Sequence, residues 1–281
     1  MSRPLCALLA IAVCGSLSLR GLVFADDDVN NTAGSDLLKT EAHKAVVAEM
    51  KRILERIKIV RQGTTPDVAE LVPQPVLNWD DIERGHYYGT TWVWGEKGRP
   101  AAIIEMYTTQ LEKTINRWPG NVVHSLSTEP LRADGTKWNW APDQPGFKPQ
   151  GLIGAPSPAA TKNLRRLQMR GLAKQFTSHE TWKGNRAELR LLPTPIWLYE
   201  SADDGILEGG LFAFVHGGTN PEVILILEAV ERDRETFWQF GCVRLGHAEI
   251  QVNFDEIEAW KRETFTELSP KSPYYHLLPS N

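Results

Sequence analysis

Two apolar runs flank one compact break in the C-terminal half of the chain, and they predict a β-hairpin. The stretch from Gly210 to Val230 is rich in aromatic and β-branched residues on both sides of residues 217–221, which read Gly-Gly-Thr-Asn-Pro. Runs of this length and composition favour strands over helices. Residues 223–227 are apolar at every position, so both faces of this strand should be covered. We therefore expect the hairpin at the centre of a sheet around which the rest of the chain packs.

Shorter apolar or alternating stretches predict the neighbouring strands. They lie at residues 87–94, 101–107, 121–131, 187–199, 237–245 and 248–254. Pro193 and Pro195 interrupt the fourth of these stretches, so this strand should lie at a sheet edge or bend there. In the last stretch apolar and polar residues alternate, which is typical of a strand with one solvent-exposed face. The short connections between consecutive strands predict an antiparallel meander.

A helical spacing of apolar residues precedes these strands. Within residues 35–62, one apolar stripe consists of Val46, Met50, Ile53, Ile57 and Val60, as expected for an amphipathic helix. This stripe either packs on the protein's own sheet or forms a coiled-coil seam with a partner helix.

A second helix should begin at Ser157 and run to about Ser178, because a capping hydroxyl followed by proline is typical of a helix start. Its expected buried stripe consists of Leu164, Leu167, Leu172 and Phe176. Its expected solvent-exposed basic row consists of Arg166, Arg170 and Lys174.

The whole pattern predicts an α+β protein, with an N-terminal helix followed by a curved, mainly antiparallel sheet and one long helix packed on it. Residues 26–78 should form the N-terminal helix and a proline-rich linker from residue 63 onward. Residues 79–265 should form the α+β sheet domain, and residues 266–281 a flexible tail.

The first 25 residues have the pattern of a secretory signal peptide. Arg3 precedes an apolar run over residues 5–13, and Val-Phe-Ala at 23–25 stands before three aspartates. The run is too short for a transmembrane span, which needs ~20 apolar residues. We expect cleavage after Ala25 and export to the periplasm or the exterior. A lipid anchor on Cys14 is the alternative.

Cleavage would leave 256 of the 281 residues and change the formal net charge from −4 to −6, since the segment carries two arginines and no acid. This mild acidity disfavours a nucleic-acid partner, because basic residues must neutralise phosphates. Cys6 and Cys14 would leave with the segment, so Cys242 could form no disulfide within the chain. Its apolar neighbours predict a small core residue rather than a nucleophile.

The sequence carries no strong catalytic or cofactor motif, such as a phosphate loop, Gly-x-Ser-x-Gly or His-Glu-x-x-His, and we expect no cofactor. Five histidines lie too far apart in sequence for the usual zinc-ligand spacing, namely His86, His124, His179, His216 and His247. His124 and His216 lie in or beside apolar strands, where core histidines are commoner than metal ligands, and we expect no metal site. His124 and Ser125 could belong to a catalytic triad only if the fold supplied the geometry.

Tryptophan usage offers the best candidates for ligand contacts. Ten tryptophans occur, and two pairs stand two residues apart: Trp92 with Trp94, and Trp138 with Trp140. In a strand such residues point to the same face. Exposed rings could stack on sugars or a flat apolar ligand, whereas buried rings would be core residues. Burial is favoured for the first pair, while the second opens a proline-rich loop at residues 138–158. We therefore take Trp138 and Trp140 as the first candidates, followed by Trp92 and Trp94.

Several segments resemble an uncharacterised family of exported proteins from planctomycete bacteria. They are residues 98–100, 124–127, 166–173, 189–195, 204–205, 211–215 and 219–222. The resemblance covers roughly residues 85–260 and implies secretion and a shared fold, but the family has no activity to transfer. An aspartate usually precedes the proline in that family where Asn220 stands in this chain, which puts any role of that acid in doubt here.

These features predict an exported protein that binds a ligand or a cell-envelope partner without catalysis, through the concave face of its sheet. Two alternatives remain open. One is an exported hydrolase with a histidine and acid site, and the other is a structural protein that binds a partner through its first helix.

Overall fold

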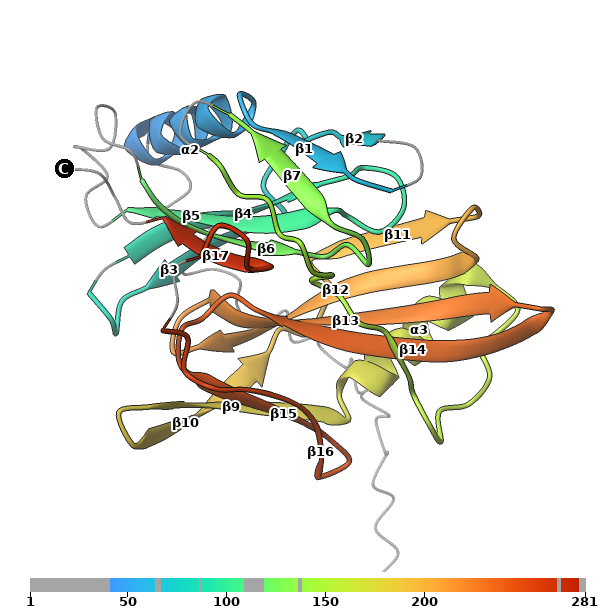
Figure 1. The fold of residues 1–281 in the computed structure, drawn as a ribbon. Helices are drawn as coiled ribbons and strands as arrows, with labels where there is room; N and C mark the ends of the chain where they lie inside the picture. The colour runs from blue at the N-terminus through green and yellow to red at the C-terminus, as the bar shows by residue number, and fades with distance from the viewer. Residues whose placement is uncertain are drawn as a thin grey trace, which may run out of the picture. The chain divides into compact units, whose positions relative to one another are not determined.

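The hairpin predicted around residues 210–230 forms the centre of the largest sheet (Figure 1). In the computed structural model, β12 (Ile206–His216) and β13 (Asn220–Arg232) pair antiparallel along nearly their whole length. Residues 223–227 of β13 are fully buried, which confirms that both faces of this strand are covered. The structure describes residues 41–63, 67–85, 87–108, 119–135, 138–266 and 269–277.

The largest sheet has nine strands, with the path β16-β15-β9-β10-β12-β13-β14-β8 and β11 also paired to β12. The other strands of this sheet are β8 (Gln150–Gly151), β9 (Phe176–Trp182), β10 (Asn185–Leu191), β11 (Trp197–Ser201), β14 (Glu235–Arg244), β15 (Glu249–Phe254) and β16 (Ile257–Arg262). The prolines at 193 and 195 separate β10 from β11, which pair with different parts of β12. The predicted interruption of this strand is thereby confirmed.

The sheet curls because two strands that are consecutive in sequence lie far apart in its order. β14 and β15 are separated by five interstrand spacings, which would amount to ~24 Å in a flat sheet. The four residues between them, 245–248, can span at most ~18 Å. The sheet therefore has to bend into a half-barrel. The predicted meander holds for β12, β13 and β14, but β15 pairs with β9 and β16 instead of β14.

A five-stranded sheet covers one face of this half-barrel. Its order is β17-β6-β5-β4-β3, with bounds β3 (Leu77–Asp81), β4 (Tyr87–Trp94), β5 (Ala102–Thr108), β6 (Gly120–Ser125) and β17 (Tyr274–Leu277). One of its faces shares a core with β12 and β13, through residues such as Val93, Ile103, Ala213 and Ile224. The strand predicted at 121–131 ends at Ser125. Residues 274–277, predicted as part of a flexible tail, form an ordered strand paired with β6.

The other face of the five-stranded sheet is covered by α2 (Glu41–Leu54) and a small sheet of β2 (Asp67–Ala69), β1 (Lys58–Arg61) and β7 (Leu131–Asp134). The helix predicted over 35–62 ends at Leu54, and residues 35–40 lie outside the described part of the chain. Ile59 and Val60 pair in β1 because β-branched residues fit a strand as well as the apolar stripe of a helix. Val46, Met50 and Ile53 are buried in this core, so the stripe packs on the protein's own sheet.

The region predicted as a linker, residues 63–78, contains β2 and the beginning of β3. Residues 64–66 lie outside the described part. The described residues, from 41 onward, belong to one compact unit.

The second helix, α3 (Lys162–Ala173), lies on the opposite face of the half-barrel sheet and is shorter than predicted. Leu164 and Leu167 are 52% and 59% exposed, so the predicted buried stripe is wrong for them. Met169 is buried instead, and its Sδ lies 2.6 Å from the position that a Cβ on Gly210 would occupy. Because Gly210 has no side chain, α3 can approach β12 closely at this point, and the helix face that carries Met169 turns toward the sheet. Of the predicted basic row, Arg166 pairs with Glu208, while the other two remain exposed.

The described residues are mostly antiparallel strand, and helix contributes less than an α+β expectation implies. No described helix is long and apolar enough to cross a membrane.

Candidate ligand-binding pocket

The tryptophan pairs do not form a ligand platform. Trp92, Trp94 and Trp140 are 0% exposed and Trp138 is 5% exposed, all in the core beneath α2. The rings of Trp138 and Trp140 meet edge to face at 6.5 Å, and the Trp140 Nε1 donates a hydrogen bond to the Ser272 carbonyl at 2.9 Å. The prediction that these rings contact a ligand is therefore corrected. The apolar residues that cover these rings come from segments distant in sequence, so the polar neighbours of Trp138 and Trp140 in the sequence gave no sign of their burial.

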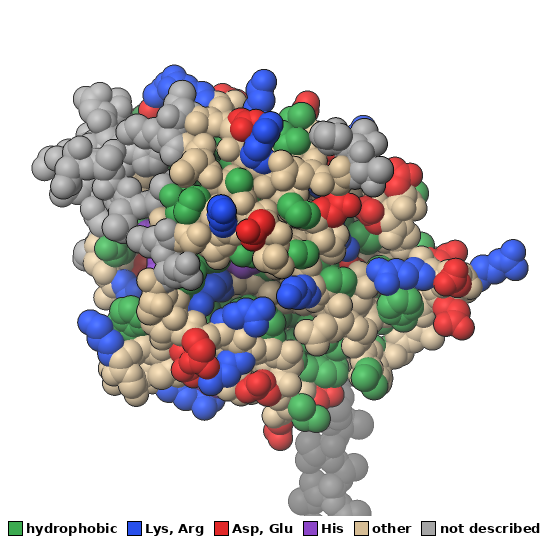
Figure 2. Space-filling view, in the orientation of Figure 1, with side chains coloured by type: hydrophobic (Ala, Val, Ile, Leu, Met, Phe, Trp, Pro, Cys, Tyr) green, Lys and Arg blue, Asp and Glu red, His purple; other side chains and the backbone are tan. Residues whose placement is uncertain are grey.

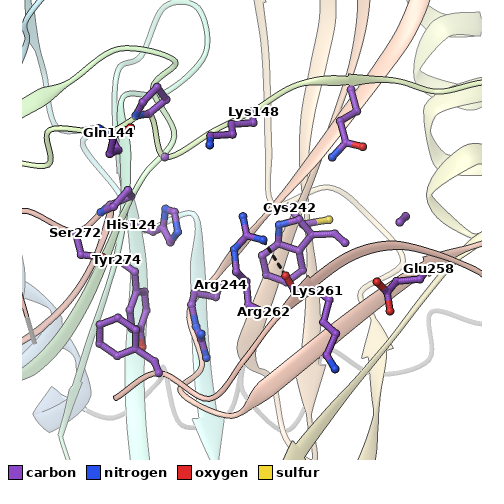
Figure 3. A pocket seen from close by; sticks show the side chains of 17 residues that line it. His124, Gln144, Lys148, Cys242, Arg244, Glu258, Lys261, Arg262, Ser272 and Tyr274 are labelled. Carbon is purple, nitrogen blue, oxygen red and sulfur yellow. Dashed lines mark hydrogen bonds between the residues drawn. The ribbon is translucent and has the colours of Figure 1, made fainter. Parts of the chain in front are cut away.

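A pocket of about 570 Å³ opens between the two edges of the half-barrel, and we call it the seam pocket (Figure 3). Cys242 and Arg244 of β14 line one side, and residues 258–262 of β16 line the other. The rim of the pocket is completed by residues 144–146, Lys148, Gln150 and residues 272–274. The seam stays open because β8 pairs only with Gln239 and Phe240 of β14. Pockets of this volume commonly hold small molecules.

Basic side chains dominate the lining of the seam pocket. They are Lys148, Arg244, Lys261 and Arg262, against a single lining carboxylate, Glu258. Figure 2 shows basic side chains gathered around a hollow on this face of the molecule. The imbalance gives the pocket a positive potential, which favours anionic ligands.

The four cations differ in the hydrogen bonds and ion pairs that they already form within the protein. Arg244 is buried and donates to the carbonyls of Gly246, Glu263 and Ala248 at 2.6 to 2.8 Å. It therefore fixes the connection between β14 and β15. Lys261 shares its charge with Glu249 at 3.3 Å and Glu263 at 3.5 Å.

Lys148 and Arg262 form no ion pair among the described residues and remain available to a ligand, and of the two only Arg262 carries a guanidinium. Its guanidinium lies over the Trp260 ring, 4.9 Å from the ring centroid, and donates to the Lys261 carbonyl at 2.8 Å (dashed in Figure 3). Within the described residues no carboxylate forms an ion pair with Arg262. Burial lowers the pKa of Arg244, and the charge of Arg262 lowers it further. Two like charges thus line one pocket.

His124 lies at the inner side of the same pocket. It is 7% exposed, and its Nδ1 lies 2.8 Å from the Ser125 carbonyl oxygen. Burial lowers the pKa of His124 to about 4, with Arg244 and Arg262 acting in the same direction. The Ser125 hydroxyl is buried and accepts a hydrogen bond from the Ser127 amide. Since His124 contacts the carbonyl of Ser125 rather than its hydroxyl, these two residues do not form a nucleophile–base pair.

Cys242 lines the pocket but has the character of a core residue. It is 6% exposed, and burial raises the pKa of its thiol well above its usual value. Because the thiolate is the nucleophile, a raised pKa makes this cysteine unreactive. The interpretation of Cys242 as a small core residue agrees with this environment.

A second polar cluster lies where β3, β9, β12 and β13 meet, and we call it the Arg84 cluster: Asp81, Arg84, Glu180, His216 and Glu222. Arg84 donates hydrogen bonds to both Glu180 and Glu222, and its Nε lies 3.8 Å from Asp81 Oδ2. His216 Nδ1 approaches Glu180 Oε1 at 2.8 Å, without the alignment of a hydrogen bond. The cluster ties β3 of the five-stranded sheet to the half-barrel.

The carboxyl groups of this cluster are closed off from solvent. The side chains of Glu180 and Glu222 are 5% and 3% exposed. Burial raises the pKa of Glu222 to about 8, partly offset by the positive charge of Arg84. Asn220 Nδ2 lies 3.4 Å from Asp81 Oδ2 and 3.5 Å from Glu222 Oε1. An aspartate at 220 would place a further negative charge beside these two acids.

Histidines also gather beside the seam pocket. His247 and His276 lie 4.4 Å apart between ring centroids, and the Tyr107 hydroxyl lies 2.7 Å from His276 Nε2. His276 falls in the stretch predicted as a loose tail, so sequence reasoning missed it. His179 lies on β9 away from this group, and His86 lies outside the described residues. Over the part of the chain that is described, no three histidine, cysteine or acidic side chains are arranged to hold a metal ion.

No protein-family model matches the sequence, and neither a curated protein nor a solved structure matches the chain. The resemblance to exported planctomycete proteins therefore stays a prediction.

Sequence reasoning missed the basic residues that line the seam pocket. Arg244 and Arg262 come from separate strands, and Lys148 comes from the proline-rich loop. The one local signal is Trp260-Lys261-Arg262, an aromatic residue followed by two cations on a strand.

Proposed function

We propose that this protein is exported and binds a small anionic ligand in the seam pocket, without catalysing a reaction there. The observation that carries the proposal is the guanidinium of Arg262, which faces a pocket of about 570 Å³ beside Arg244 and has no carboxylate partner among the described residues. A guanidinium presents two parallel N–H groups to a carboxylate, sulfate or phosphate. An anion in this place would also relieve the repulsion between the two arginines.

The body of the ligand would lie on apolar and aromatic surface. Trp260, Phe265 and Tyr274 line the pocket beside the cations, and a ring or short chain attached to the acid group could cover them. Burial keeps the Cys242 thiol protonated, so this cysteine supplies no reactive nucleophile to the pocket, which supports binding over catalysis.

The hydrolase alternative has less support. The fold does bring His216 next to Glu180, as that hypothesis requires, but Arg84 already donates hydrogen bonds to Glu180 and Glu222. The partner-binding alternative has less support as well, because the apolar stripe of α2 is buried on the protein's own sheet.

Replacement of Arg262 with alanine should weaken the binding of anions about 10-fold to 100-fold. A charge-assisted hydrogen bond contributes about 1.5–3 kcal/mol, and every 1.4 kcal/mol is a factor of ten in Kd. NMR titration of the full chain with phenylacetate, and with its neutral analogue phenylacetamide, measures this effect. Wild type should bind phenylacetate at least about tenfold more tightly than the amide.

Arg186→Ala is the matched control, since Arg186 lies on β10 and pairs only with Glu188 at the surface. This variant should bind phenylacetate as wild type does. Equal affinity of wild type for the acid and the amide, or unchanged binding by Arg262→Ala, would contradict the proposal.

The exported state is tested separately from binding. The protein isolated from its native cells should begin at Asp26, because the small residue Ala25 ends the predicted signal peptide. Mass spectrometry of the N-terminal peptide measures this directly. Detection of a peptide that begins at Met1 in the mature, cell-associated protein would overturn the export part of the proposal.

A further inference from the structure

The seam pocket contains neutral groups among its cations: Gln144, Gln150, Ser272 and the buried His124. Lys148, Lys261 and Arg262 can only donate hydrogen bonds. His124 lines the same pocket, and more than nine-tenths of its surface is buried. An imidazole in this position can present either a donor or an acceptor, depending on which nitrogen carries the proton.

The contact to Ser125 decides which nitrogen carries the proton. A backbone carbonyl can only accept, so the Nδ1 that lies 2.8 Å from the Ser125 oxygen must donate. The neutral ring then leaves a lone pair on Nε2. No described residue bonds to this Nε2, and the atom is not enclosed. We take it to be accessible from the pocket that His124 lines.

This lone pair stays available over the physiological pH range. The pKa of His124 is lowered to about 4, mainly by burial, so the ring is neutral well above that value. A ligand group that meets Nε2 must therefore donate a hydrogen bond. A cationic donor, such as an ammonium, would be repelled by Arg244 and Arg262, whose charges both act on His124. A neutral hydroxyl meets both conditions.

We propose that the seam pocket selects hydroxy acids, with the acid group on Arg262 and a neighbouring hydroxyl donating to His124 Nε2. This inference rests on the proposed function and names the ligand class: carboxylic acids with a hydroxyl close to the acid, the pattern also found in uronic sugars. His124 is then a specificity residue, while Arg262 supplies affinity for any anion.

Mandelate and phenylacetate test this directly, because they differ only by the hydroxyl beside the carboxylate. Each is titrated into the full chain by NMR or calorimetry. Wild type should bind one enantiomer of mandelate about 3-fold to 10-fold more tightly than phenylacetate, the range expected for one neutral hydrogen bond. Phenylglycine, with an ammonium in place of the hydroxyl, should bind more weakly than phenylacetate.

His124→Asn is the informative variant. The asparagine Nδ2 can still donate to the Ser125 carbonyl in place of Nδ1, while its acceptor Oδ1 sits on a shorter side chain and does not reach the place of Nε2. The ratio of the two Kd values, phenylacetate over mandelate, should fall to about onefold. Arg262→Ala should weaken both ligands together, which separates the two roles.

The outcomes distinguish this inference from the function on which it rests. Equal wild-type affinity for mandelate and phenylacetate, both tighter than phenylacetamide, would overturn the hydroxy-acid class and leave anion binding in place. Equal affinity for phenylacetate and phenylacetamide would overturn both. If His124→Asn fails to fold, the ¹⁵N resonance of His124 Nε2 in wild type decides. It should shift on addition of mandelate but not phenylacetate, and the absence of such a shift would overturn the inference.

Discussion

Replacing Glu222 with glutamine should flatten the dependence of stability on pH above neutrality. Burial raises the folded-state pKa of Glu222 to about 8, from an ordinary value of 4.5. An acid with a raised pKa contributes stability that is fully present below the unfolded pKa and is lost as pH rises through the folded pKa. For Glu222 this loss extends from about pH 4.5 to about pH 8.

The window between pH 6.5 and pH 9 isolates this group from the buried histidines. The pKa values of His124 and His247 are lowered to about 4. The contribution of these histidines to the free energy of unfolding is present above their unfolded pKa of about 6.5, and it is lost as the pH falls. Between pH 6.5 and pH 9, the free energy of unfolding of wild type should therefore fall by about 2 kcal/mol. Glu105 adds a loss of the same sign, because burial and Glu222 both raise its pKa.

Urea denaturation at the two pH values measures the effect. Glu222→Gln keeps a neutral group of the same shape beside Arg84, so at least half of the wild-type pH dependence should disappear. Glu188→Gln removes an exposed acid on β10 and serves as the control, with an unchanged slope. An unchanged slope in Glu222→Gln would mean that Glu222 is ionised in the folded protein at neutral pH.

The double change of Trp138 and Trp140 to alanine should unfold the protein or lower its stability severely. Both rings are buried and in mutual contact. Removal of one buried Trp typically costs about 3–5 kcal/mol. Two adjacent losses are coupled rather than additive, but together they approach the whole stability of an ordinary domain, about 5–15 kcal/mol.

Thermal unfolding followed by circular dichroism measures this loss. Trp182, on β9, is 46% exposed and provides the control, since Trp182→Ala should cost far less. Trp140→Phe keeps most of the ring but loses the hydrogen bond to the Ser272 carbonyl, so it should fall between the two. An unchanged melting temperature in the double variant would place the rings at the surface and restore them as ligand contacts.

Local pattern was a good guide where it was unambiguous. The hairpin of β12 and β13 followed from two apolar runs around a Gly-Gly-Thr-Asn-Pro break. The local sequence pattern was less reliable where a residue suited both a helix and a strand. Val60 continues the helical stripe of α2 in sequence, yet β-branched residues also suit strands, and the pairing of Val60 with Arg132 of β7 decided the matter. The orientation of α3 depended on Gly210, which lies on a strand distant in sequence.

The candidate pocket could not be predicted in the same way. His124, Arg244 and Arg262 lie on three different strands, and they line one pocket only because the half-barrel curls and the five-stranded sheet covers it. The prediction that Trp138 and Trp140 are exposed was wrong for the same reason, because their polar neighbours in sequence are not their neighbours in space.

The sequence by itself determined the positions of most central strands and the interruption at the two prolines, because alternation, β-branching and proline geometry act over a few residues. Tertiary structure alone decided that β15 pairs with β9, that the tryptophans are buried, and that unpaired guanidinium charge meets a neutral imidazole in one pocket. These outcomes depend on strand order and burial, which arise from contacts between residues far apart in the chain.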